Sequence, residues 1–146
     1  MIYLRSFRSC DWQVITQYQY PGMDQAEAVK LIDEFNEPTY HGKSHKISAI
    51  ADDAQIVGYV SLMEQADGIA SIGVEVYGPF RRHGYAYAAV SQLLVFSDLL
   101  NYHTVTAQVR QDNAASLALF KKLGFAIVDD GMSRRGNPVY NLTKSI

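Results

Sequence analysis

A short basic segment at the start of a helical pattern is the part of the sequence that points most clearly to chemistry. Arg81, Arg82 and His83 follow an apolar run and precede Gly84, after which an amphipathic pattern begins. The first turn of a helix has N–H groups without partners and a partial positive charge, so it binds phosphate. Gly84 and the small Ala86 allow an anion to approach the backbone, and arginine suits bidentate phosphate contacts. This segment predicts an anion site; the alternative is a solvated basic turn without a ligand.

A second stretch of interest is the helix expected to begin at Asn113 and to end at Gly124. Its predicted core stripe, at spacings of four, consists of Ala115, Leu119 and Leu123. A separate face of the same helix consists of Asn113, Ser116 and Phe120. The simplest role of Asn113 is a helix cap, and that role is compatible with contacts to a ligand.

These two stretches resemble the motifs of a known family. The spacing Arg81-x-x-Gly84-x-Ala86 is similar to the signature with which the GNAT superfamily of N-acetyltransferases surrounds the pyrophosphate of coenzyme A. The stretch 113–125 resembles the family's other motif helix, which lies along the pantetheine arm. The close resemblance covers residues 69–125, and the rest of the chain matches in the order of elements. It implies a GNAT-like fold, with acetyl-CoA as the cosubstrate.

The resemblance also implies which residues hold the cofactor. In the family two neighbouring strands splay apart, and backbone groups of the first strand pair with the pantetheine amides, as an added strand would. The cofactor-binding residues implied in this way are Val74, Val76, Arg81, Arg82, His83, Gly84, Tyr85, Ala86, Asn113, Ser116 and Phe120.

The reaction implied is direct attack of an amine on the thioester, polarised by the Val76 N–H, without an acyl-enzyme. We expect Glu75 to be the catalytic base, because strand alternation turns it away from the face of its valine neighbours. A charged residue on an exposed part of the strand is the alternative, and a base acting through water from Glu64 or Asp67 is another. Phe120 stands where the family often has the tyrosine that protonates the leaving sulfur. The remaining candidates for that acid are Tyr77, Tyr85, Tyr87 and Tyr140.

The fold class expected is mixed α/β. The patterns predict strands at 2–7, 45–51, 55–62, 69–77, 104–110, 126–128 and 138–142, and helices at 11–18, 24–35, 84–100 and 113–123. The unit from 69 to 110 predicts a parallel, right-handed crossover. The resemblance implies a mixed, mostly antiparallel sheet of six to seven strands with a splayed parallel pair, flanked by about four helices. Strand and helix patterns are spread over the whole length with no long linker between them, which predicts one domain over residues 1–146.

Composition limits the partners. The net charge of −2 is not that of a nucleic-acid-binding protein, and no apolar stretch is long enough to span a membrane. Charges at Arg5 and Arg8 argue against a signal peptide, so we expect a cytoplasmic protein. His41 and His45 have no third ligand at suitable spacing, and no metal is expected.

The function predicted is acetyl transfer from acetyl-CoA to an amine. The acceptor expected is a small molecule, with a protein amine as the other candidate, because no extended charged face indicates a polypeptide partner. A non-catalytic acetyl-CoA-binding sensor is the alternative function. Closing strands in this family often pair between subunits, which suggests a homodimer.

Overall fold

The computed structural model describes residues 1–95 and 101–146. Its strands are β1 (Ile2–Ser6), β2 (Thr39–Tyr40), β3 (Lys43–Asp52), β4 (Gln55–Ala66), β5 (Ile69–Val76), β6 (Thr104–Arg110), β7 (Ala126–Met132) and β8 (Pro138–Ser145). Its α-helices are α1 (Trp12–Val14), α2 (Gln25–Phe35), α3 (Tyr85–Leu93) and α4 (Ala114–Lys122). Three short helical segments of other types are η1 (Ser9–Asp11), η2 (Ile15–Gln19) and η3 (Gly78–Phe80).

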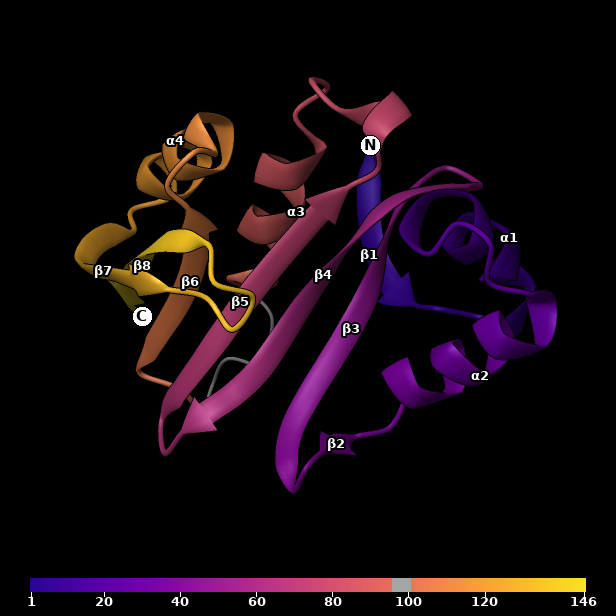
Figure 1. Cartoon of the computed structure of the whole chain (residues 1–146), viewed down its shortest axis with the longest axis horizontal. Helices are drawn as coiled ribbons and strands as arrows, with labels where there is room; N and C mark the ends of the chain where they lie inside the picture. Colours follow the sequence, from indigo (N-terminus) through magenta and orange to yellow (C-terminus); the bar gives the residue numbers. More distant parts are fainter. Residues whose placement is uncertain (96–100) are drawn as a thin grey trace.

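One mixed sheet organises the described chain, in the order β1-β3-β4-β5-β6-β8-β7, with β2 paired to β3. All neighbours are antiparallel except β5 and β6, which are parallel. A parallel pair needs a crossover, and the segment that contains α3 supplies it. Figure 1 shows β5 and β6 close at one end and diverging toward the end where α3 and α4 lie. The predicted mixed sheet with a splayed parallel pair is confirmed.

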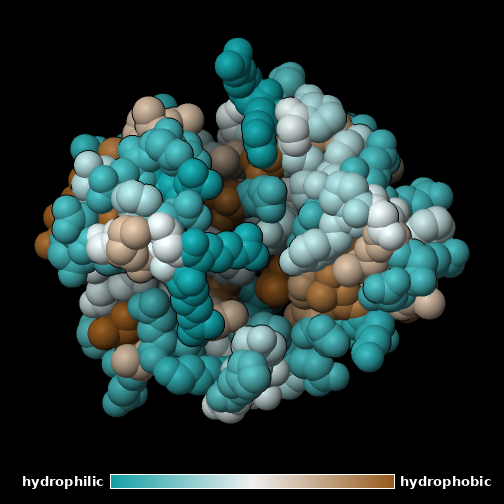
Figure 2. Space-filling view, viewed as in Figure 1, coloured by the Kyte–Doolittle hydropathy of each residue, from teal (hydrophilic) through white to brown (hydrophobic). Residues whose placement is uncertain are grey.

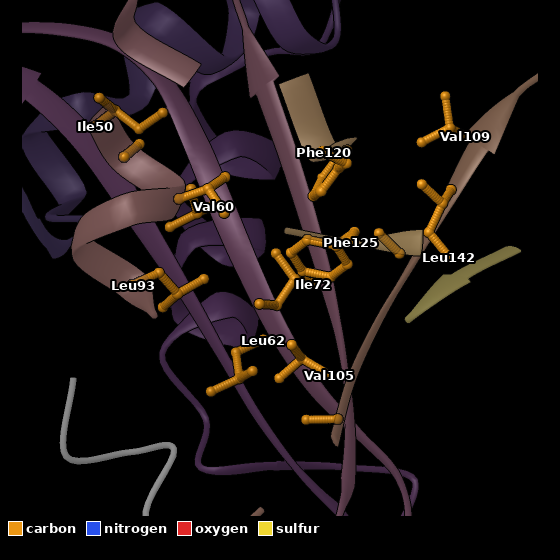
Figure 3. Packing of buried hydrophobic residues seen from close by; sticks show 14 of the residues in the cluster. Ile50, Val60, Leu62, Ile72, Leu93, Val105, Val109, Phe120, Phe125 and Leu142 are labelled. Carbon is orange, nitrogen blue, oxygen red and sulfur yellow. The ribbon is translucent and has the colours of Figure 1, made fainter. Parts of the chain in front are cut away.

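Each face of the sheet has its own core, because side chains alternate along a strand. Ile50, Val60, Ile72 and Val105 pack with α3 and α4 on one face. On the opposite face Ala49 and the other members of a second cluster pack with α1 and α2. Figure 3 shows the first core, which includes aromatic rings from α4 and from the segment that follows it.

The prediction of one continuous helix at 11–18 was wrong. The segment is instead a sequence of η1, the single-turn α1 and the π-helix η2, which carries Tyr18 and Gln19. By contrast, α2 begins as predicted, with the Asp24 side chain accepting a hydrogen bond from the Glu27 N–H at 2.8 Å.

Other element boundaries also differ from the prediction, including those of β3 and β4, which extend beyond the predicted 45–51 and 55–62. Helix α3 ends at Leu93, and the part of the predicted helix at 96–100 lies outside the described residues. The closing strands β7 and β8 are longer than predicted, because β8 pairs with β6 on one side and β7 on the other, and this ladder extends through the polar residues Asp129 and Asp130. The two-residue β2 was not predicted.

Candidate active site

The parallel strands β5 and β6 separate soon after they pair. Their register covers Ile69–Ser71 of β5 and Thr104–Thr106 of β6. Farther along, β5 continues to pair with β4, whereas β6 continues with β8. The facing edges of the two strands are therefore open between their carboxyl halves.

Backbone groups of β5 point into this opening. The Tyr77 N–H donates to the Val57 carbonyl of β4 at 2.9 Å. Alternate residues of an antiparallel strand direct their N–H and C=O groups to opposite sides, so those of Val74 and Val76 point away from β4. The Val76 carbonyl accepts a hydrogen bond from Arg81 Nε at 3.0 Å. The strand edge predicted to bind pantetheine thus has the orientation that such binding requires.

A glycine on β4 brings these strands close together. A Cβ atom at Gly58 would overlap the Glu75 carbonyl oxygen and would lie 2.9 Å from the Val76 Cα. The register of β4 with β3 also shifts beside this position, between Ile50 and Ala51. Only glycine allows this approach, which fixes where Glu75 and Val76 lie.

The basic loop places two arginines at the start of α3. Gly84 is the N-cap, with φ +77°, and Arg82 also has a left-handed φ of +68°. The first helical bond runs from the Ala88 N–H to the Gly84 carbonyl at 3.1 Å, and Gly84 contributes no side-chain cap. The N–H groups of the first turn are therefore left for a ligand. Within the described chain, neither arginine has an ion-pair partner.

His83 and Tyr85 hold the basic loop through different contacts. The His83 Nδ1 lies 3.1 Å from the Phe80 carbonyl oxygen, and its ring stacks on Tyr85 at 5.7 Å. The Tyr85 hydroxyl donates to Asp52 Oδ2 at 2.5 Å, which ties the first turn of α3 to the end of β3. The hydrogen bond with Asp52 raises the pKa of Tyr85 above its usual value.

Helix α4 borders the cleft with a face that only partly matches the prediction, because Asn113 and Ser116 line the cleft and Phe120 does not. Asn113 caps the helix, its Oδ1 accepting from the Ser116 N–H at 3.0 Å. Ala115 is exposed and lines the cleft, so its predicted place in the core was wrong. Phe120, expected on the cofactor face, is 3% exposed and packs edge-to-face on Phe125 at 5.1 Å. Figure 3 shows these two rings side by side in the core.

The opening between β5 and β6 is part of a cleft of about 870 Å³. This volume lies within the range typical of small-molecule sites. Figure 2 shows a central hollow in the face that it views, with hydrophobic residues at its base. The cleft is lined by Tyr59, Ser61, Gly73, Val74, Glu75, Val76, Phe80, Arg81, Arg82, Gly84, Tyr85, Ala86, Tyr87, Asn113, Ala115, Ser116 and Leu119. Among the predicted site residues, His83 and Phe120 are not in this lining.

Glu75 lies where strand alternation places it. Its neighbours Val74 and Val76 pack against the core under α3 and α4, and Glu75 is on the other face, opposite Tyr59 of β4. Burial raises the pKa of Tyr59, and a hydrogen bond with Glu75 and the charge of Glu75 raise it further. Burial also raises the pKa of Tyr77, with a smaller contribution from the charge of Glu75. The carboxylate therefore faces the cleft among tyrosines.

The four tyrosines considered as acids occupy unlike places. Tyr77 is buried, with its hydroxyl on Gln19 Oε1 at 2.9 Å, and Tyr85 is bonded to Asp52. Tyr87 is exposed, with Lys122 Nζ 4.6 Å from its ring centroid. Tyr140 packs against the core on β8. Of these four, only Tyr85 and Tyr87 line the cleft.

Sequence reasoning missed several cleft residues, of which Tyr59, Ser61 and Gly73 are on the sheet. Tyr59 and Ser61 are on β4 and Gly73 is on β5. The register of the two strands brings them together, with Ser61 opposite Gly73. Nothing in the local sequence marks them, because their shared position depends on strands that are distant in the chain. Gly73 leaves part of the cleft empty, since a Cβ there would lie 2.7 Å from Ser61 Oγ.

Two features that other functions would need are missing from the described residues. No group of three or more His, Cys, Asp or Glu side chains in residues 1–95 and 101–146 is gathered as metal ligands are. No helix within these same ranges is long and apolar enough to cross a bilayer.

Comparison with solved structures supports the fold. A chimera of spermidine N-acetyltransferase from Vibrio cholerae and hSSAT superposes with a TM-score of 0.80 at 18% identity, over 99% of this chain and 94% of that one. Spermidine N-acetyltransferase from Vibrio cholerae in complex with CoA and spermine gives 0.76 at 18% identity, over 99% and 95%. A putative acetyltransferase from Salmonella typhimurium with its cofactor acetyl-CoA gives 0.74 at 16% identity, over 99% and 94%.

Comparison at the level of sequence identifies the family. No curated protein matches the sequence. The profile of the acetyltransferase (GNAT) domain family, however, matches residues 3–126, which is most of the chain. With the splayed strands and the basic loop in place, this match shows that the chain belongs to the GNAT family of acetyltransferases.

Proposed function

We propose that this protein transfers an acetyl group from acetyl-CoA to a primary amine of a small molecule, by direct attack of the amine on the thioester. The observation that carries the proposal is the open edge of β5, which continues into a basic loop at an uncapped helix N-terminus. One end of this continuous surface suits amides and the other end suits phosphates. Similar structures contain CoA or acetyl-CoA, which supports the choice of cofactor.

The cofactor would lie along the surface in one direction. Its pyrophosphate would accept hydrogen bonds from the first turn of α3 and from Arg81 and Arg82, which have no carboxylate partners in the described chain. Its pantetheine amides would pair with Val74 and Val76. Asn113 already caps α4 with its side-chain oxygen, which leaves its amide NH₂ as a donor for the same arm.

The chemistry needs two protons to leave the ammonium group and the acetyl carbon to exchange its bond to sulfur for a bond to nitrogen. An acceptor amine arrives as ammonium, so Glu75 takes one N–H proton and frees the lone pair. The nitrogen then attacks the acetyl carbon, while the Val76 N–H donates to the carbonyl oxygen as it gains negative charge. Collapse breaks the C–S bond and releases the thiolate of CoA. The amide product retains the acetyl group, and the thiolate and the nitrogen's second proton leave to solvent. Glu75 releases the first proton to solvent, which regenerates the base.

The buried Phe120 does not prevent this reaction. A thiol has an ordinary pKa of about 8.5, so a thiolate leaves near neutral pH without an obligatory acid. Tyr85 has its hydroxyl on Asp52, and Tyr87 is exposed at the rim. The proposed mechanism therefore assigns no general acid within the described chain.

The acceptor is proposed to be a small cationic amine. Glu75 supplies a negative charge, and the rings of Tyr59 and Phe80 line the cleft nearby, where aromatic faces attract cations. A cleft of this size suits a small molecule more than a polypeptide. The spermidine acetyltransferases among the similar structures act on amines of this class, which supports the proposal.

The first experiment is isothermal titration with acetyl-CoA, with ADP as the control, followed by turnover on a panel of primary amines that includes spermidine. The proposal expects binding that depends on the pantetheine arm and release of free CoA with at least one amine. Binding without turnover on any amine would favour a cofactor sensor. No binding to a folded protein would contradict the cofactor site.

Replacing Glu75 by Gln tests the base. We expect kcat to fall by about 10²–10⁴, because the amide cannot accept the ammonium proton. The affinity for acetyl-CoA should stay within a few-fold of wild type, since Glu75 lies on the opposite face from the phosphate loop. Unchanged kcat with the best amine of the panel would exclude Glu75 as the base.

We propose three further properties with this function. The protein acts as a single domain over residues 1–146, because β1 and β8 belong to one sheet. It works in the cytoplasm, where acetyl-CoA is made available. It forms a homodimer through β7, an edge strand whose residues are all exposed, including Val128 and Met132.

A further inference from the structure

A tyrosine opposite the proposed base carries an inference that goes beyond the reaction itself. Tyr59 of β4 and Glu75 of β5 are direct partners in the antiparallel register, so their side chains lie next to each other on the same face. Both line the cleft. The Tyr59 hydroxyl is therefore placed to donate to the Glu75 carboxylate, and a hydrogen bond with Glu75 and the charge of Glu75 contribute to the raised pKa of Tyr59.

The ring of Tyr59 packs against a buried aromatic ring. It contacts Tyr77, with ring centroids 6.4 Å apart, and Tyr77 is 1% exposed. Tyr77 is itself fixed by stacking on Tyr18 at 5.3 Å and by the hydrogen bond from its hydroxyl to Gln19. The π-helical segment η2 therefore holds Tyr77, and Tyr77 limits the positions open to the ring of Tyr59.

We propose that Tyr59 is a positioning residue, whose hydroxyl fixes the Glu75 carboxylate in the orientation that accepts the proton of the acceptor amine. This rests on the proposed function. A carboxylate on a strand has several rotamers, and a catalytic base works only within a narrow range of positions. A hydrogen bond from a phenol held by packing removes that freedom before the acceptor binds.

Two observations favour a role through Glu75 over direct chemistry by Tyr59. Tyr59 is on β4, one strand farther from the opening than Glu75, so the carboxylate lies between the phenol and the thioester site. Its pKa is raised by burial and by Glu75, so the phenol keeps its proton and remains a donor. The other ionisable groups that act on this pair are Tyr77 of β5 and Tyr20 at the end of η2, and the charge of Asp11 of η1 acts on Tyr77.

The test begins with Tyr59→Phe, which keeps the ring and its packing and removes only the hydroxyl. Using the amine with the highest turnover in the panel, we expect kcat to fall roughly 10- to 100-fold. The KM for acetyl-CoA should not change. Tyr40→Phe is the matched control, since Tyr40 is 54% exposed on β2 and does not line the cleft.

A double-mutant cycle with Glu75→Gln decides whether Tyr59 acts through Glu75. If it does, Tyr59→Phe has little further effect in the Glu75→Gln protein. Additive losses, or a Tyr59→Phe enzyme with the wild-type kcat, would overturn the inference while leaving the proposed function intact. If wild type acetylates no amine, the proposed function fails and this inference falls with it.

Discussion

At the scale of single residues, the predicted cofactor site depends on one backbone conformation. Gly84 has φ +77° at the start of α3, and a Cβ there would meet no atom within 4 Å. The position is open to the cleft and is strained for any residue with a side chain. A charged substitution at Gly84 therefore tests the effect of charge on cofactor binding without a steric clash inside the protein.

Gly84→Glu should weaken acetyl-CoA binding by at least about a hundredfold, because a carboxylate beside the phosphate loop repels the pyrophosphate. Isothermal titration measures this change. The matched control is Gly22→Glu, which has a comparable backbone, with φ +92° and open space, but is not in the cleft lining. Equal affinity of the two folded variants would contradict the placement of the phosphates.

At the scale of elements, the site depends on how strands and short helices are held. Two features outside the predicted motifs do this. Gly58 allows β4 to approach β5 closely at the backbone of Glu75. An ion pair between Arg5 of β1 and Asp11 of η1 anchors the segment that leads to η2.

Gly58→Ala should destabilise the fold by about 1–3 kcal/mol, because the new Cβ overlaps backbone atoms that cannot rotate away. It should also lower kcat by moving Glu75. Urea unfolding and turnover measure the two effects. Gly131→Ala, on the exposed β7 with nothing within 4 Å, is the control and should change stability little. A stable Gly58→Ala protein with full activity would refute this role.

The pair of Arg5 and Asp11 predicts a dependence on pH. Arg5 donates two hydrogen bonds to Asp11, at 2.8 and 3.0 Å. Burial by itself raises the pKa of Asp11, but the hydrogen bonds from Arg5 and from the Arg8 N–H outweigh it, and the pKa lies below the ordinary 3.8. The stabilisation is therefore fully present above pH 3.8 and is lost as pH falls through the lower folded-state pKa.

Asp11→Asn should lower the free energy of unfolding by about 1–3 kcal/mol at pH 7, because charge-assisted hydrogen bonds are lost. Urea unfolding over a series of pH values should show this difference shrinking below pH 3.8. Asp112→Asn is the control, since the Arg110–Asp112 pair is 56% and 69% exposed and contributes little. A difference that persists unchanged at low pH would argue against the ion pair as its source.

At the scale of the whole molecule, the sheet separates two sides of the reaction. The α3 and α4 side carries the basic loop and the larger core, and the α1 and α2 side carries Glu75 with its tyrosines. The opening between β5 and β6 joins the two sides. In the proposed reaction, the cofactor and the acceptor would approach from opposite faces of the sheet and meet at Val76.

Helix α4 links this arrangement to stability. Phe120→Ala should cost about 3–5 kcal/mol, because it leaves a cavity beside Phe125. Its affinity for acetyl-CoA should change little where the protein is folded. Leu119→Ala, one residue earlier and in the cleft lining, should show the reverse: a smaller loss of stability and a weaker affinity. Urea unfolding and isothermal titration measure both variants, and the opposite ranking would place Phe120 in the site.

The sequence by itself determined the parts of the protein that are contiguous in the chain. The strand, the basic loop and the start of α3 run from Ile69 to Ala86 without interruption, so their conformations and charges follow from neighbouring residues. Alternation along β5 likewise placed Glu75 opposite to its valine neighbours. The crossover to β6 follows from the handedness of parallel connections.

Only the tertiary structure decided which distant residues meet. Tyr59 faces Glu75 because the register of β4 against β5 aligns them, and Tyr85 reaches Asp52, 33 positions away. Phe120 turned into the core because the helix rotated to bury its largest apolar side chain, which a stripe of smaller residues did not predict. Local pattern fixes conformation along the chain, whereas packing and register across it decide which side chains share a site.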